Sequence, residues 1–251
     1  MKKLFKYEMI KTRLSKFIIL GITAVLEIIF LLGLANSDEG MQSTGILLLT
    51  LIAVASILWI GIQSVITLHR DMNTRQSYML FMTPNSCYKI LGAKYLENGL
   101  SILFSGLFFG ALGALDITLL FNHYHQLDQL MDILKEILGA FTKNISLDPA
   151  SIISFIVYLL FDWLFTVSLA YLAVIVCTAL LNGRKGNLFL SFLLFLGLEI
   201  LFSILFGKIF PGEVTNGTMV AAFLPRAGLC LIITAVVYWI NARIMEKYLS
   251  V

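Results

Sequence analysis

Four carboxylic acids interrupt the apolar stretches of this 251-residue chain, and their chemistry would be proton transfer or polar binding inside a membrane. An ionised carboxylate at the centre of a bilayer costs about 2.5 kcal/mol or more on insertion scales, so such a side chain faces the protein interior and is a candidate functional residue. Asp116 lies near the outer end of its apolar run, whereas Glu27, Asp162 and Glu199 lie deeper. For each deep carboxylate, a functional role and a structural role with a protonated or hydrogen-bonded side chain both stay open.

Other signatures of catalysis and metal binding are missing from the sequence. The motifs H-E-x-x-H, G-x-S-x-G and G-x-x-x-x-G-K-[ST] do not occur, which excludes those hydrolase routes and a nucleotide-binding P-loop. His123 and His125 have no Cys or acidic companion at ligand spacing, so we expect loop histidines. Cys87, Cys177 and Cys230 are too scattered for a disulfide framework. We therefore expect no enzymatic activity, no metal and no cofactor bound by this chain.

The elements that carry these residues are predicted to be membrane-spanning helices. The chain is 59% hydrophobic and 13% charged, with a mean hydropathy of +0.91, which is far from the composition of a soluble domain. Runs without strand-like alternation must be helices, because backbone groups in lipid need partners within their own segment. We predict an all-α integral membrane protein, a single transmembrane domain over residues 1–251, with six spans at about 17–34, 46–66, 99–121, 152–181, 188–206 and 226–244.

Basic residues predict the orientation. Fourteen of the 18 Lys and Arg residues fall in the N-terminal segment, between spans two and three, between spans four and five, or in the C-terminal tail. By the positive-inside rule these regions and both termini are cytoplasmic. We therefore expect a multi-pass protein of the plasma membrane.

Three segments outside the spans have patterns of their own. Residues 2–16 show apolar side chains at helical spacing beside basic ones, which indicates an amphipathic helix on the inner leaflet or a basic topology anchor. The outer loop at 122–150 contains a second amphipathic pattern over 127–141, typical of a helix on the outer leaflet or of a lid. Asp148 and Pro149 are predicted to start span four as its N-cap and first turn.

The approach to the sixth span is ambiguous. The apolar piece 219–224 is too short to cross a membrane and is followed by Pro225 and Arg226, which favours a re-entrant or interfacial helix before the span. In the competing interpretation, span six begins near Met219 and the Arg226 side chain snorkels to the interface.

Span three carries Gly99, Gly106, Gly110 and Gly113 on one helical face, including a G-x-x-x-G. Small residues let another helix approach closely. The partner helix is either another helix of this chain or one from a second subunit.

The segment 69–97 is the most polar part of the predicted cytoplasmic side. A charged piece, 70–76, continues from span two, and an apolar piece, 77–82, returns to the membrane surface. Pro84 breaks the helix, and Ser86 is placed to cap a new helix that runs from Cys87 into span three. A polar segment in a chain without a P-loop is expected to contact another protein.

This arrangement resembles the permease subunits of ABC transporters of the type-2, exporter class, particularly the short six-span bacterial forms. The likeness covers the topology of nearly the whole chain and is concentrated in one loose pattern formed by Asp71, Tyr78, Leu80, Phe81, Pro84, Ser86, Ile90, Leu91, Gly92 and Lys94. The long outer loop after span three departs from the family pattern.

The resemblance implies an ATP-driven export permease that works as a dimer. It implies a cytoplasmic coupling helix between spans two and three that docks on a separate ATP-binding cassette subunit, where ATP and Mg are bound. It further implies a second permease copy or a homologous permease and membrane lipid as partners, and no nucleic acid. We expect a peptide or an amphiphile as substrate. The implied contact residues are Arg70, Asp71, Asn73, Thr74 and Arg75.

Two alternatives come from other functional classes. A proton-coupled secondary transporter would use Glu27, Asp162 and Glu199 as a relay. A non-transporting membrane scaffold or immunity protein would show no flux coupled to any ATPase.

Overall fold

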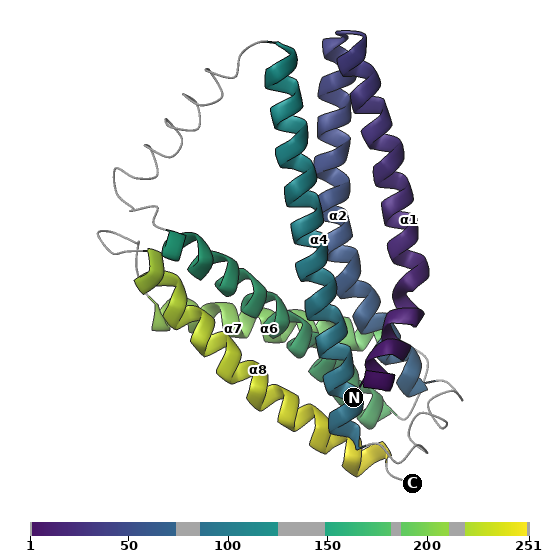
Figure 1. The fold of residues 1–251 in the computed structure, drawn as a ribbon. Helices are drawn as coiled ribbons and strands as arrows, with labels where there is room; N and C mark the ends of the chain where they lie inside the picture. The colour runs from purple at the N-terminus through teal and green to yellow at the C-terminus, as the bar shows by residue number, and fades with distance from the viewer. Residues whose placement is uncertain (1, 74–85, 125–148, 182–186, 211–218, 250–251) are drawn as a thin grey trace. The chain divides into compact units, whose positions relative to one another are not determined.

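The computed structural model describes residues 2–73, 86–124, 149–181, 187–210 and 219–249, and nearly all of them are helical (Figure 1). Within these ranges six helices are long and apolar enough to span a membrane. For the described residues, the predicted all-α class and six helices of spanning length are therefore confirmed. The helices are α1 (Lys2–Ala35), α2 (Glu39–Asn73), α4 (Cys87–His123), α6 (Pro149–Leu181), α7 (Asn187–Ile209) and α8 (Met219–Leu249).

Large apolar side chains lie on the outside of these helices. Leu14, Leu107 and Ile232 are more than 60% exposed, whereas the amide side chains of Asn98 and Asn241 are fully buried. A soluble protein distributes the two kinds of side chain the other way round, because water solvates polar groups and excludes apolar ones. This distribution fits a multi-pass membrane protein, in which lipid surrounds the helices.

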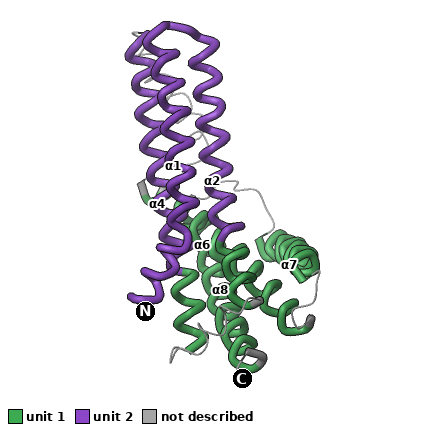
Figure 2. Tube along the Cα trace, turned by 90° about the vertical axis from the view of Figure 1, so that its right-hand side faces the viewer, with its two compact units in different colours: residues 1, 64–95, 138–251 green, residues 2–63, 96–137 purple. Residues whose placement is uncertain are grey.

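The described helices fall into two compact units (Figure 2). Unit 1 contains residues 64–95 and 138–251, and unit 2 contains residues 2–63 and 96–137. In unit 1, α6 packs along α7 and α8. The largest core cluster of this unit is built from Leu68, Met72, Leu91, Val167, Tyr171, Val174, Ile175, Ala242 and Met245.

The hairpin of α1 and α2 in unit 2 is closed by a short turn and a cap. Ser37 takes up a left-handed backbone conformation with φ 53°. Asp38 Oδ1 then accepts hydrogen bonds from the backbone N–H groups of Gly40 (3.0 Å) and Met41 (3.2 Å), which caps the start of α2. The two helices approach so closely that a Cβ atom on Gly45 would lie 2.9 Å from Phe30 Cβ. Glycine is needed there because the neighbouring atoms belong to a helix backbone and its first side-chain carbon.

Replacing Gly45 by Ala should therefore lower the free energy of unfolding by about 1–3 kcal/mol, the usual cost of overpacking. Gly21→Ala in α1 is the matched control, because no heavy atom lies within 4 Å of a Cβ built there. Unfolding of the two variants by SDS titration measures the difference. Equal stability of Gly45→Ala and the parent protein would contradict the close packing of α1 on α2.

Helix boundaries depart from the predicted ones at both ends of the chain. The N-terminal residues 2–16 are the first part of α1, which continues to Ala35. Pro225 does not separate two helices, since α8 runs through it from Met219 to Leu249. The interpretation in which span six begins near Met219 therefore agrees with the structure, and the separate helix over 219–224 was wrong. A membrane helix tolerates an internal proline, because local adjustments satisfy the carbonyl group that loses its donor.

Several predictions fall outside the described residues. These are the amphipathic helix over 127–141, the N-cap role of Asp148, and the part of the cytoplasmic segment at 74–85. The structure does place Pro149 at the first position of α6, where a proline without an N–H group is favoured. Which side of the membrane holds the termini stays a prediction.

Candidate functional site

A buried ion pair in unit 1 joins the two helices that flank the segment 74–85. Lys94 Nζ of α4 donates to Asp71 Oδ2 of α2 at 2.6 Å, and the two side chains are only 3% and 7% exposed. Removing both charges from water is costly, so the short contact must compensate for their desolvation. The pair therefore fixes the last turn of α2 relative to the first turns of α4.

Aromatic packing supports the start of α4 in the same unit. The ring of Tyr95 contacts those of Tyr171 and Tyr238 edge to face, with centroid distances of 5.0 and 5.5 Å. Tyr238 also donates from its hydroxyl group to the backbone carbonyl of Tyr88 at 2.7 Å. Ser64 of α2 forms a short hydrogen bond with Tyr171 of α6. These contacts hold α2, α4, α6 and α8 together on the side where the segment 74–85 begins and ends.

The residues predicted to contact an ATPase subunit occupy different environments. Arg70 is exposed, whereas Asp71 is buried and paired with Lys94. Asn73 is the last residue of α2, and Thr74 and Arg75 lie outside the described residues. Of the described side chains Arg70 is thus accessible to a partner, and we expect Asp71 to position the segment.

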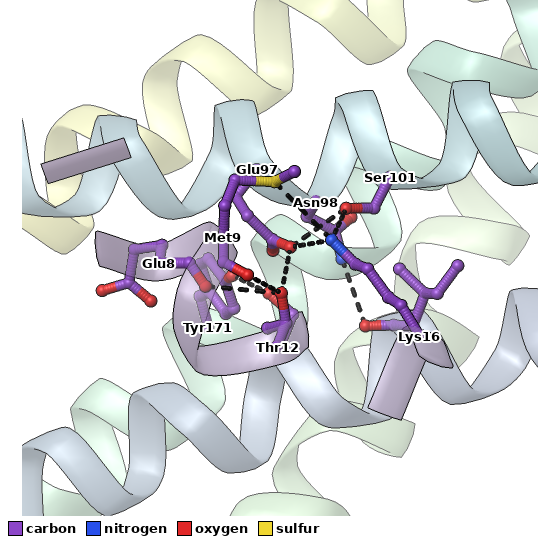
Figure 3. Close-up of polar contacts among 10 residues, drawn as sticks. Glu8, Met9, Thr12, Lys16, Glu97, Asn98, Ser101 and Tyr171 are labelled. Atoms are coloured by element: carbon purple, nitrogen blue, oxygen red, sulfur yellow. Dashed lines mark hydrogen bonds and ion pairs between the residues drawn. The ribbon is translucent and has the colours of Figure 1, made fainter. Parts of the chain in front are cut away.

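A second polar network lies in unit 2, between α1 and α4 (Figure 3). Glu97 Oε1 accepts hydrogen bonds from Thr12 Oγ1 (2.8 Å), Lys16 Nζ (2.6 Å) and Ser101 Oγ (3.0 Å). Lys16 Nζ also donates to Ser101 Oγ at 2.6 Å. Glu97 is 4% exposed, so its charge depends on these donors. The network attaches the first third of α1 to α4.

Sequence reasoning missed this network, although a signal was present. Thr12 and Lys16 are four residues apart on one helix, and Glu97 and Ser101 are four residues apart on another. Side chains at that spacing share a helical face. Polar side chains beside predicted spans need hydrogen-bonding partners, and the two faces provide donors and acceptors for each other.

The membrane carboxylates form two separate groups. Glu27 and Asp116 interact with each other in unit 2, and Asp116 is 7% exposed. Asp162 and Glu199 belong to unit 1. The proposed relay through all three deep carboxylates stays a prediction, since its members are divided between the units.

Asp162 and Glu199 line a cavity of about 280 Å³ within unit 1. Asp162 comes from α6, Glu199 from α7 and Arg226 from α8, so each of the three helices contributes one charged residue. The remaining lining residues are aromatic, hydroxyl-bearing or small: Tyr158, Phe165, Thr166, Ser203, Phe206, Gly207, Phe210 and Cys230.

No family model, curated protein or solved structure matches this chain. Its functional interpretation therefore rests on the residues themselves: the two polar networks, the carboxyl pair and the charged cavity.

The glycine face of α4 is open along most of its length. A Cβ built on Gly106, Gly110 or Gly113 meets no heavy atom of the described chain within 4 Å. Packing against another helix of the same chain is thus not seen at these three positions. A face for a second subunit stays a prediction.

His123 forms a hydrogen-bonding contact of 3.1 Å between its Nε2 atom and Ser37 Oγ. This contact links the end of α4 to the turn between α1 and α2. Within the described ranges, no three His, Cys, Asp or Glu side chains gather in a way that could hold a metal ion. His125 lies outside those ranges.

Proposed function

We propose that this chain is the membrane-spanning permease subunit of an ATP-driven exporter of the type-2 ABC class. It would form the translocation pathway as a dimer and would take its energy from separate ATP-binding cassette subunits. The chain itself would carry out no catalytic step.

The observation that carries this proposal is the buried Asp71–Lys94 pair. A loop that transmits movement from a soluble partner to membrane helices must be fixed to those helices at its ends. Asp71 lies on α2, just before the segment 74–85, and Lys94 lies on α4, just after it, so the pair connects the two helices that flank the segment. The aromatic contacts of Tyr95 extend that connection to α6 and α8. A displacement of the segment would therefore move several helices of unit 1 together.

Six apolar helices and the lack of a P-loop support the same proposal. A transport subunit without nucleotide-binding residues needs another protein to supply its energy. Arg70 is exposed beside the buried pair, where it could meet an acidic surface of that protein.

Reversing the charge of Arg70 tests the proposed contact. Arg70→Glu should lower co-purification of the ATP-binding cassette subunit with the tagged chain from native membranes by about tenfold, because like charges then meet at the interface. ATP turnover of the purified complex should fall with it.

Arg243→Glu is the matched control, because Arg243 is also an exposed arginine but lies on α8. Its guanidinium group lies over the ring of Trp239, one turn earlier on the same helix. The contact at Arg70 would be ruled out by unchanged co-purification and turnover in Arg70→Glu. The whole proposal would be ruled out if no nucleotide-hydrolysing subunit accompanies the chain from native membranes.

A further inference from the structure

The cavity of unit 1 has the charge pattern of a site for a cationic group. Two carboxyl groups, Asp162 and Glu199, line it together with one guanidinium group, Arg226. The two carboxyl groups are close enough to interact electrostatically. Arg226 lies over the ring of Phe210, 5.4 Å from its centroid, and among the described residues no ion pair joins it to either carboxylate. The cavity thus offers more acceptors than its own basic residue satisfies.

One carboxylate oxygen of a residue that lines this cavity has no partner in the part of the chain that the structure describes. Glu199 Oε1 is buried and accepts no hydrogen bond. Thr166 interacts with the same carboxyl group, and the Cys230 thiol lies 4.0 Å from Asp162 Oδ1, which is a weak contact at best. The described chain thus offers few donors to these two carboxyl groups, so the site favours a ligand that brings N–H groups.

Aromatic rings supply the rest of the cavity wall. Tyr158, Phe165, Phe206 and Phe210 all line it, and Phe165 contacts Phe206 edge to face at 5.6 Å. Aromatic faces attract cations and also pack against alkyl chains. Ser203 and Gly207 line the cavity and are exposed, so it opens on the outer side of α7, where the surrounding residues are apolar.

The volume limits what can enter. Pockets for complete drug-sized ligands usually measure about 300–1,000 Å³, so a cavity of about 280 Å³ holds a head group or a side chain but not a bulky molecule. An alkyl chain attached to such a head group could leave past Ser203 and Gly207 into the apolar surroundings.

We propose that this cavity binds the primary ammonium group of a cationic amphiphile, between Asp162 and Glu199, with the hydrocarbon part against the aromatic wall. The N–H groups of the ammonium would donate to carboxylate oxygens of Asp162 and Glu199. This inference goes beyond the proposed function, because binding here needs no ATPase subunit and stands or fails separately from the contact at Arg70.

Direct binding of dodecylammonium to the full chain tests the site. The chain is placed in phosphatidylcholine nanodiscs without any partner subunit, and empty nanodiscs correct for partition into lipid. The double variant Asp162→Asn with Glu199→Gln should bind dodecylammonium at least tenfold more weakly than the parent chain. Dodecanol, which lacks the charge, should bind the parent chain at least tenfold more weakly than dodecylammonium does. Dodecyltrimethylammonium, which has no N–H donor, should lie between the two.

A matched control changes the same two residue types elsewhere in the membrane region. Glu27→Gln with Asp116→Asn removes the carboxyl pair of unit 2 and should leave dodecylammonium binding within twofold of the parent value. Arg226→Gln removes from the cavity the positive charge that repels the ligand, so it should tighten dodecylammonium binding by about three- to tenfold. A variant that fails to fold could not show such an increase in affinity.

Three results would each overturn the proposal. The first is parent-like affinity in the Asp162/Glu199 double variant, and the second is an equal loss in the Glu27/Asp116 control. The third is an affinity of Arg226→Gln for dodecylammonium that is no higher than that of the parent chain. This third measurement remains decisive even if the double variant does not fold.

Discussion

Replacing Asp71 by Asn is expected to lower the free energy of unfolding by about 3–5 kcal/mol, the cost typical of breaking a buried ion pair from one side. The cause lies in Lys94, whose side chain is 3% exposed and would lose the carboxylate 2.6 Å from its Nζ atom. Asparagine keeps the shape and one acceptor oxygen of Asp71, so the loss would come from the missing charge. SDS titration of the purified chain measures it.

A double-variant cycle separates pairing from general damage. Asp71→Asn combined with Lys94→Met removes both charges and should be more stable than Asp71→Asn alone, since no unpaired charge remains buried. Lys89→Met is the control on the same helix, because Lys89 is exposed and its removal should cost less than about 0.5 kcal/mol. Additive losses in the cycle would mean that the two residues do not stabilise each other.

The second large effect is expected at Glu97. Glu97→Ala removes the acceptor for Thr12, Lys16 and Ser101 at once, and should lower the free energy of unfolding by about 2–4 kcal/mol. The side chain of Lys16 is 27% exposed, so water screens part of its ion pair and the loss stays below that of a fully buried pair. Glu97→Gln keeps an acceptor oxygen and should recover about half of the loss.

Glu39→Ala serves as the control for this prediction, because Glu39 is an exposed glutamate in the first turn of α2 and belongs to the same unit. Its loss should cost less than about 1 kcal/mol, through the helix dipole alone. If Glu97→Ala proves no more destabilising than Glu39→Ala, the network does not hold α1 to α4.

The two ion pairs belong to different units. Asp71 and Lys94 belong to unit 1, whereas Lys16 and Glu97 belong to unit 2. The two ion pairs are thus separate supports, one between α2 and α4 and the other between α1 and α4.

The sequence alone determined the class of this protein and its six helices. The cost of placing a side chain in lipid depends mainly on its type, so a run of about 20 apolar residues identifies a span without knowledge of its neighbours. The same reasoning located Asp162 and Glu199 as membrane carboxylates. It was wrong about Pro225, because a breaker residue is judged by local propensity, whereas a helix in lipid must keep its backbone hydrogen-bonded.

Tertiary structure alone decided which polar residues meet. Lys94 lies 23 positions from Asp71, and Thr12 lies 85 positions from Glu97. Their contacts depend on how each helix is rotated about its axis and which neighbour it packs against, and the residue types do not specify either. The same holds for the cavity, in which α6, α7 and α8 each contribute one charged side chain. Hydropathy is a property of one segment at a time, while an ion pair or a binding cavity is a property of helices already packed together.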